Sequence, residues 1–379
     1  YRLLPTLEVF KVQVTNISNP VLKTEVIAAL KEVFKNIGSN DLEFVKKTTL
    51  DFCINKEFEK CFVKGIDLLR EGKRDEILTM FNLASKKGMV DHLGHDYMKD
   101  IDLRYDEEIM IANRIPTGWP AIDEITDGGI PAGKLVTWIG GPGSTITLHS
   151  IHVGAHALKL GKRVLHYTLE LDECYVAKRY DSTVTHIGLD NLKYQISDVK
   201  RHLKKYNGNL LIKHFPTKSI SIHGLRAHIE KTILMGDRPD LIILDYADLL
   251  KLSSNSNMRK DELLQELYEQ LVGLAGELGI PIHTASQVNR AGAGSDVIGG
   301  ENVSESYGKM FTVDLAISIS RKAKDKINNT GRIHIIKNRM GPDGMTFPEK
   351  VDTSKGLIEI YNENSESGKK TKEAMGTDE

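Results

Sequence analysis

The segment Leu135-Val-Thr-Trp-Ile-Gly-Gly-Pro-Gly-Ser-Thr-Ile-Thr-Leu-His149 decides how the fold of this 379-residue chain is predicted. An apolar run ends in a Gly/Pro-rich turn, and residues compatible with a helix follow. This order predicts a strand, a phosphate-binding loop and a helix. Such a loop presents backbone N–H groups, and the helix adds its positive N-terminal end, so the site suits a polyphosphate.

The loop departs from the usual pattern G-x-x-x-x-G-K-[ST] at two positions. Gly140 and Thr147 occupy the first glycine and the hydroxyl position, but Thr145 replaces the second glycine and Ile146 replaces the lysine. The absent lysine removes a phosphate contact of several kcal/mol at most. The residues that we expect to contact nucleotide here are Gly140, Gly141, Pro142, Gly143, Ser144, Thr145, Ile146 and Thr147.

Composition excludes few classes of function. The hydrophobic content of 40% and charged content of 27% are ordinary for a globular chain. The net charge of −1 gives no global reason to expect nucleic-acid binding, so any basic surface must be local. Sparse cysteines without zinc spacing predict free thiols in a reducing compartment. We expect no membrane segment, and a start at Tyr1 without Met favours a fragment or processed chain.

Helical spacing of apolar residues predicts helices over about 21–36, 41–72 and 75–87, separated by glycine-containing turns. We therefore expect a small all-α domain over residues 1–98, as a helical hairpin or small bundle, with Cys53 and Cys61 as buried thiols. Residues 99–113 are expected to form a linker. The polar tail 362–379 lacks apolar anchors and is expected to be disordered.

Between residues 114 and 361, short apolar runs alternate with helical patterns. This alternation predicts an α/β domain with a mostly parallel sheet that is covered on both faces. The expected strands are Leu135–Ile139, Arg163–Leu169, Leu210–His214, Leu241–Leu244, Ile282–Ala285, Leu315–Ser320 and Arg332–Ile336.

Polar side chains stand directly after these strands, where functional groups gather in parallel sheets. Asp245 suits a Mg²⁺ site together with Thr147, and Glu170 suits a general base that orients water. Gln287 suits a sensor of the γ-phosphate. Asp245 could instead cap a turn, and Glu170 could instead be a carboxylate at the N-terminus of the following helix. For Gln287 alone, the sequence favours the sensor role and the absence of such a role equally.

Three further segments carry basic residues. The loop 288–300, with Arg290, and the loop 253–260, with Arg259 and Lys260, are candidates for gripping a nucleic-acid backbone; the alternative is two solvated loops. Lys337 and Arg339 lie two residues apart on one face of a strand end. They suit an arginine-finger pair that reaches a phosphate in a neighbouring subunit, or else an exposed basic hairpin.

Residues 114–350 resemble the ATPase domain of DnaB-like replicative helicases, especially those of phages. The front helical part resembles their N-terminal collar and linker more loosely. The segments that carry the resemblance are Pro116–Trp119, Gly128–Gly133, Tyr167–Leu171, Leu244–Asp248, Ala285–Arg290 and Lys337–Gly344.

The resemblance implies a RecA-like P-loop NTPase in a hexameric ring, with ATP and Mg²⁺ at subunit interfaces and single-stranded DNA in the channel. It assigns Glu170 as the catalytic glutamate, Asp245 to the Mg²⁺ site and Gln287 as phosphate sensor. Arg179 matches an arginine that contacts nucleotide, and Lys337 with Arg339 matches the pair acting in trans. It also implies a primase partner, a helicase loader and a bacterial or phage-infected cytoplasm.

Three hypotheses remain open: an ATP-driven ring helicase, a catalytically impaired RecA-fold subunit with a structural or nucleic-acid-binding role, and a recombinase-like filament former. The polar strand ends favour the helicase over the impaired subunit, and the segment Lys337–Gly344 favours it over the recombinase. The loop departure has three explanations: a variant that uses another cation such as Lys337 of a neighbour, an altered or misassigned stretch, or a degenerate site.

Overall fold

The computed structural model divides the chain into two units, Tyr1–Arg104 and Tyr105–Glu379. The division falls inside the segment 99–113 that the sequence predicts as a linker, directly after the short helix α5 (Ile101–Arg104). The structure describes residues 14, 20–35, 42–70, 77, 80, 81, 84, 96–106, 114–252, 258–288, 297–299 and 308–375.

The first unit is helical, as predicted. Helix α2 (Pro20–Lys35) precedes the long helix α3 (Leu42–Arg70). Phe81 lies against α3, with its ring centroid 5.1 Å from that of Phe62, and the buried Cys61 Sγ lies 3.7 Å from the carbonyl oxygen of Met80. The Cys53 side chain and most of the expected third helix lie outside the described residues. No described helix is long and apolar enough to cross a membrane.

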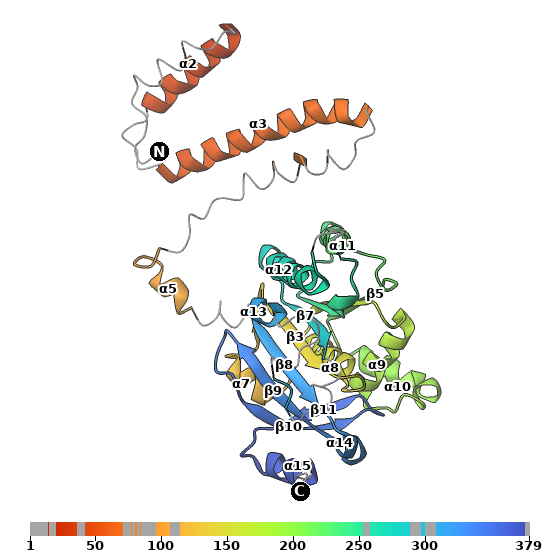
Figure 1. The fold of residues 1–379 in the computed structure, drawn as a ribbon. Coiled ribbons are helices and arrows are strands. Elements are labelled where there is room, and N and C mark those ends of the chain that lie inside the picture. Colours follow the sequence, from red (N-terminus) through yellow and green to blue (C-terminus); the bar gives the residue numbers. More distant parts are fainter. Residues whose placement is uncertain are drawn as a thin grey trace. The chain divides into compact units, whose positions relative to one another are not determined.

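The second unit is built on a nine-stranded sheet with the order β11-β10-β9-β8-β3-β7-β6-β4-β5 (Figure 1). Neighbouring strands from β8 to β5 pair in parallel, whereas β9, β10 and β11 pair antiparallel at the other side. The strands are β3 (Leu135–Gly140), β4 (Arg163–Thr168), β5 (Asn209–His214), β6 (Leu241–Asp245), β7 (Ile282–Gln287), β8 (Leu315–Ser320), β9 (Thr330–Asn338), β10 (Thr346–Asp352) and β11 (Leu357–Ile360).

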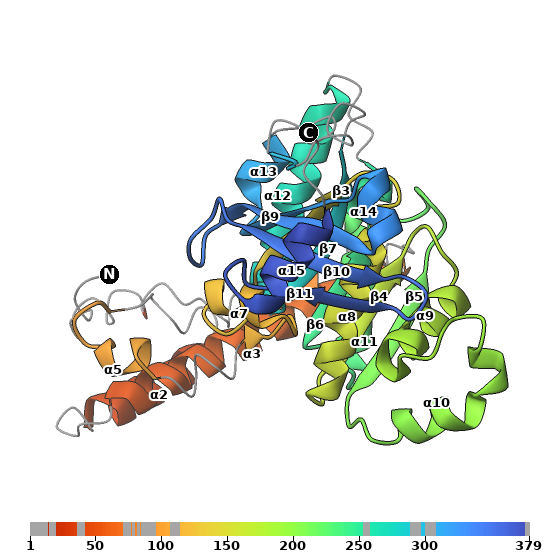
Figure 2. The same cartoon turned by 90° about the horizontal axis from the view of Figure 1, so that it is seen from below.

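Strands β3, β6 and β8 are buried at every position, which explains their continuous apolar composition. One core includes Trp138 and Ile243 together with residues of α7, α8 and α9, and a second core includes Ile139 and Leu244 with residues of α11 and α12. Figures 1 and 2 label these helices. The helices are α7 (Pro120–Ile125), α8 (Ile146–Lys159), α9 (Glu173–Thr185), α10 (Ile196–Leu203), α11 (Ile222–Leu234), α12 (Lys260–Leu278), α13 (Gly308–Thr312), α14 (Ala323–Asn328) and α15 (Glu366–Met375). This RecA-like architecture confirms the predicted fold class.

Two parts of the second unit differ from the sequence prediction. Strands β10 and β11 extend the sheet, although their alternating polar residues gave no apolar run. The segment 362–379, predicted to be disordered, contains α15. This helix begins after Ser365, whose Oγ accepts a hydrogen bond from the Gly368 N–H at 3.0 Å, and it buries Met375. A capping serine at its start and buried residues on one face, Thr371 and Met375, accompany the packing of this helix against β10 (Figure 2).

Candidate active site

The carboxyl ends of β3, β4, β6 and β7 meet around a pocket of about 450 Å³. Predicted site residues from four separate segments line it together. Gly140 lies at the buried end of β3, just before the loop. The lining residues are Gly141, Pro142, Gly143, Ser144, Thr145, Ile146, Thr147, Leu148, Glu170, Arg179, Asp245, Tyr246, Ala285, Ser286, Gln287 and Thr353.

The loop has the backbone of a phosphate-binding turn despite its unusual sequence. Gly143 and Thr145 both have positive φ, +73° and +70°. The left-handed region costs a non-glycine residue about 1–2 kcal/mol, so Thr145 is strained where the pattern expects glycine. Ile146 begins α8 and packs against the apolar core, and its hydrocarbon side chain offers no charge to a phosphate.

Asp245 provides the strongest sign of a cation site. Its side chain is 2% exposed, and Oδ2 has no hydrogen-bond partner within the described structure. The pKa of Asp245 is raised to about 6, because burial and the negative charge of Glu170 raise it more than the hydrogen bond with Thr147 and the charge of Arg179 lower it. A buried carboxylate oxygen without a partner, next to a threonine hydroxyl, fits the oxygen ligands that Mg²⁺ prefers.

Glu170 and Gln287 are exposed at the pocket on either side of Asp245. The Leu169 N–H donates to the Asp245 carbonyl oxygen at 2.8 Å, which fixes the backbone just before Glu170. Gln287 pairs in register with Gly140, and the next N–H, of Val288, donates to the Gly140 carbonyl oxygen at 3.2 Å. Backbone pairing therefore sets the positions of both side chains relative to the phosphate loop.

A buried polar network supports the end of β7. The Lys309 ammonium group is 3.0 Å from Asp248 Oδ2, which also accepts a hydrogen bond from Ser286 Oγ at 3.0 Å. Tyr268 OH donates to Asp248 Oδ1 at 2.9 Å. Ser286 directly precedes Gln287 in β7, so the network holds the strand next to the predicted sensor. The sequence predicted a role for none of these side chains. Asp248 lies within a motif of the resemblance, but Lys309 carried no recognisable signal.

A second buried pair lies behind the phosphate loop. His149 Nε2 is 2.8 Å from Glu349 Oε2, and both side chains are fully buried. The other ring nitrogen of His149, Nδ1, is 2.9 Å from the Thr145 carbonyl oxygen. The pair thus connects β10 to the strained residue of the loop, which was not predicted because β10 itself was not.

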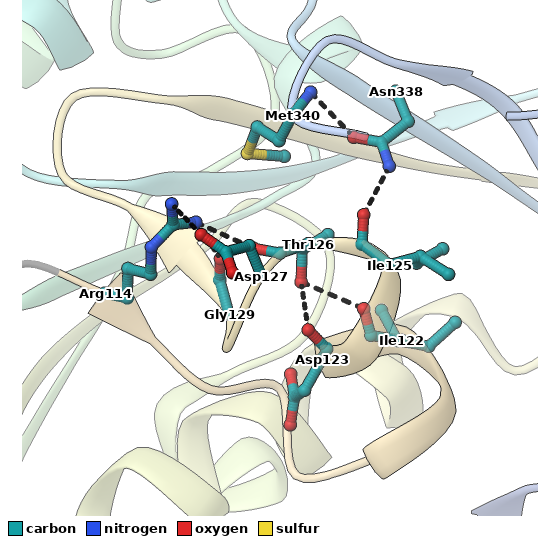
Figure 3. A network of polar contacts seen from close by, with 9 residues as sticks. All are labelled: Arg114, Ile122, Asp123, Ile125, Thr126, Asp127, Gly129, Asn338 and Met340. Carbon is teal, nitrogen blue, oxygen red and sulfur yellow. Dashed lines mark hydrogen bonds and ion pairs between the residues drawn. The ribbon is translucent and has the colours of Figure 1, made fainter. Parts of the chain in front are cut away.

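Lys337 and Arg339 do not line the pocket. They flank Asn338, whose Nδ2 donates to the Ile125 carbonyl oxygen at 2.8 Å (Figure 3). The same Nδ2 donates to the Pro342 carbonyl oxygen at 3.0 Å. Arg339 Nη1 is 3.4 Å from Asp314 Oδ1. Burial lowers the pKa of Lys337, and the charge of Arg339 lowers it further.

Strand direction explains this separation. Because β9 runs antiparallel to β8, Asn338 pairs with Leu315 at the edge where the parallel strands begin. Asp314, the partner of Arg339, also accepts a hydrogen bond from the Leu135 N–H at the start of β3. Leu135 is five residues before Gly140, which corresponds to roughly 17 Å along an extended strand.

The turn-rich segment before β3 supports the Asn338 anchor. Arg114 Nη1 donates to the Thr126 carbonyl oxygen at 2.7 Å, and its Nη2 is 2.9 Å from Asp127 Oδ2 (Figure 3). The Thr126 hydroxyl donates to the Ile122 carbonyl oxygen at 2.9 Å. These bonds hold the end of α7, which carries the Ile125 carbonyl group that Asn338 binds.

The predicted DNA-contacting residues are only partly described. Arg259 is exposed at the start of α12, 3.1 Å from Asp261 Oδ2 and 3.3 Å from Glu262 Oε1. Lys260 is exposed beside it. Arg290 lies outside the described residues. Neither Arg259 nor Lys260 lines the pocket.

Residues 114–348 match the family model of the DnaB-like helicase C terminal domain. A DnaB-like replicative helicase of Enterobacteria phage T4 is 26% identical over 265 residues, covering 66% of this chain and 55% of that protein. The replicative DNA helicase DnaB of Geobacillus stearothermophilus is 24% identical over 241 residues, covering 58% and 52%. The chain thus spans about half the length of these curated relatives.

Solved structures agree on the fold. One solved structure is described as that of a DnaB-like replicative helicase and its interactions with primase. It superimposes with a TM-score of 0.66 at 15% identity, covering 93% of this chain and 87% of that chain. A structure described as an ATPase domain gives 0.58 at 17% identity, covering 71% of this chain and 100% of that chain. The family match covers more than half of the sequence, and the chain belongs to the DnaB-like helicases.

Proposed function

We propose that this protein is an ATP-dependent DNA helicase that assembles as a ring, hydrolyses ATP at subunit interfaces and moves along single-stranded DNA to unwind duplex. One observation carries the proposal. The phosphate loop, Glu170, Arg179, Asp245 and Gln287 come from separate segments and line a single pocket. This set contains candidates for the Mg²⁺ ligands, the general base and the phosphate sensor of nucleotide hydrolysis; the loop lysine and the charge from a neighbouring subunit are not among them.

Within the pocket, Thr147 and Asp245 would hold Mg²⁺, which neutralises charge on the phosphates when bound. Glu170 is exposed and orients the attacking water, from which it accepts a proton as general base. Gln287 donates a hydrogen bond to the γ-phosphate, and Arg179 contacts the nucleotide. These assignments give one role each to the five residues Thr147, Glu170, Arg179, Asp245 and Gln287.

Lys337 and Arg339 act on a neighbouring subunit in this proposal. Their strand end lies at the edge of the sheet away from their own pocket. Asn338 and its partners hold the segment in place, so the two cations are presented without a flexible loop. A ring would bring them to the next pocket, where they stabilise the charge that develops during phosphoryl transfer.

DNA contact in this proposal uses Arg259, Lys260 and Arg290, through phosphates and without sequence preference. A primase and a helicase loader are the expected protein partners. The proposal also includes a location in the cytoplasm of a bacterium or a phage-infected bacterium.

The loop supports a second candidate, a subunit of a DnaB-like assembly that does not hydrolyse ATP. Ile146 brings no charge and Thr145 strains the backbone. Such a subunit would retain DNA binding and assembly. It differs from the first candidate in one measurable property, turnover of the purified parent protein.

The test is an ATPase assay on the purified full chain, with and without single-stranded DNA. We expect DNA-stimulated turnover in the parent and a decrease of about a hundredfold or more in Glu170→Gln, with Mg-ATP binding retained. The matched control is Glu124→Gln, which removes an exposed carboxylate of α7 outside the pocket.

Absence of turnover in a parent that still binds DNA would favour the second candidate. Equal turnover of Glu170→Gln and the parent would remove Glu170 from the mechanism.

A further inference from the structure

The connection between β8 and β9 runs beside the phosphate loop. Strand β8 is parallel to β3, and Ile319 pairs with Gly140. The chain therefore leaves β8 after Ser320 at the same edge at which the phosphate loop leaves β3. The connection contains four cationic residues and only one acidic residue, and the cations are Arg321, Lys322, Lys324 and Lys326.

Lys326 reaches the loop itself. A Cβ atom on Gly143 would lie 3.1 Å from Lys326 Nζ, so the ammonium group lies next to the backbone of a residue that lines the pocket. Gly143 has φ +73° and presents open backbone at this point. Lys326 is exposed, and its ammonium group has no hydrogen bond or ion pair with any residue that the structure describes. It is therefore available to an incoming anion.

The backbone that carries Lys326 is fixed. Asp325 is 1% exposed; its Oδ2 accepts hydrogen bonds from the Lys322 N–H at 2.9 Å and from Arg332 Nη1 at 2.8 Å. The helix ends at Asn328, with Asn329 as its C-cap residue, and Asn328 Nδ2 donates to the Ala374 carbonyl oxygen of α15 at 2.8 Å. Helix α14 is thus tied to β9 and α15, while the exposed Lys326 side chain can adjust its position.

We propose that Lys326 binds the β- and γ-phosphates of the nucleotide and supplies, from within the same chain, the positive charge that Ile146 lacks. The inference rests on the proposed function, since it assumes that the pocket takes a nucleoside triphosphate. A lysine suits this role because its ammonium group is a compact charge on a flexible stem and can follow the phosphates. Arg179, which also lines the pocket, supplies a second cation from α9.

The test compares Lys326→Met with Lys324→Met in the full chain. Lys324 is an exposed lysine of the same helix and lies two residues away, so it controls for the loss of surface charge. Binding of a fluorescent ATP analogue, of ADP and of AMP is measured with Mg²⁺, independently of turnover. We expect Lys326→Met to bind the ATP analogue about tenfold or more weakly, with a smaller change for AMP. Lys324→Met should match the parent within twofold.

A rescue separates lost charge from disturbed folding. The double variant Lys326→Met with Ile146→Lys should recover ATP binding, because it restores a lysine at the usual position of the loop. Equal ATP binding by Lys326→Met and the parent would overturn the inference while leaving the proposed helicase intact. Weak binding that Ile146→Lys does not restore would also overturn it.

The parent protein distinguishes the remaining cases. A parent that binds ATP through Lys326 but shows no turnover would refute the proposed function and support the inference. A parent that binds no nucleotide would refute both.

Discussion

The two edges of the large sheet differ in how many groups of a nucleotide site one chain places there. At the edge where β3, β4, β6 and β7 end, the pocket collects acidic, amide and cationic groups from one subunit. At the opposite edge, Lys337 and Arg339 stand beside Asn338 and Asp314, and neither lines the pocket. The first edge carries most groups of a nucleotide site but lacks the loop lysine, whereas the second presents cations away from that site.

Strand direction causes the difference. Side chains that follow parallel strands gather at one edge, but the reversal at β9 returns the chain to the other edge. A motif that follows an antiparallel strand therefore cannot join the pocket of its own subunit without crossing the sheet. The comparison favours a division of labour in which each chain completes the site of its neighbour.

The largest expected effect tests this division directly. Arg339→Ala should decrease DNA-stimulated turnover by about a thousandfold while leaving Mg-ATP binding within a few fold, because an arginine acting in trans stabilises charge only during transfer. Turnover and nucleotide binding are measured on the same preparation. Lys350→Ala removes an exposed cation from β10 and should leave both quantities unchanged.

Mixing variants separates action in trans from action in cis. Arg339→Ala and Glu170→Gln should each be inactive, yet mixed oligomers should regain part of the turnover. Some interfaces in the mixture pair an intact Glu170 with an intact Arg339 of the neighbour. Failure of every mixture to regain turnover, despite proven subunit exchange, would contradict the division between the two edges.

The pocket edge was largely predictable from sequence, and the reason is geometric. Glu170, Asp245 and Gln287 each follow an apolar strand, and parallel strands end at one edge, so adjacency in space follows from local pattern alone. The loop pattern also identified Thr145 as a misfit, and the structure gives it a left-handed backbone.

The groups around that pocket were not predictable in the same way. Lys326 approaches Gly143, and Glu349 approaches His149, across more than 150 residues of chain. Those contacts depend on where β8 and β10 enter the sheet, and no local spacing carries that information. The buried Lys309 was not predictable for the same reason, because its ion pair with Asp248 joins residues that are 61 positions apart in the chain.

Both edges belong to one sheet, so protonation of buried groups in its central strands should destabilise both edges together. His166 in β4 and His283 in β7 are fully buried, and burial lowers the pKa of each to about 3. The unfolded chain binds these protons near pH 6.5, whereas the folded chain does not. The free energy of unfolding therefore carries no penalty from these histidines above about pH 6.5, and it decreases as the pH falls from about 6.5 towards 3. Each histidine should lower the free energy of unfolding by about 2 kcal/mol between pH 7 and pH 5.

The measurement is urea unfolding followed by tryptophan fluorescence. The chain has two tryptophans, Trp119 and Trp138, both buried in the second unit, so the signal reports this sheet. His166→Gln should lose about 2 kcal/mol less than the parent over this pH range. His223→Gln, at an exposed position of α11, should follow the parent. An unchanged pH slope in His166→Gln would mean that this histidine is protonated in the folded state.

The smallest expected effect concerns strain that is confined to the pocket edge. Thr145→Gly relieves about 1–2 kcal/mol of left-handed backbone strain but adds about 0.4–1 kcal/mol of freedom to the unfolded chain. The net gain in the free energy of unfolding should be about 0.5–1 kcal/mol, measured by the same tryptophan fluorescence. Thr145→Ala is the matched control, because it removes the hydroxyl group and keeps the strain. A gain as large in Thr145→Ala would attribute the effect to the hydroxyl group, whose hydrogen bond to the Ser144 carbonyl oxygen is local, and not to the backbone.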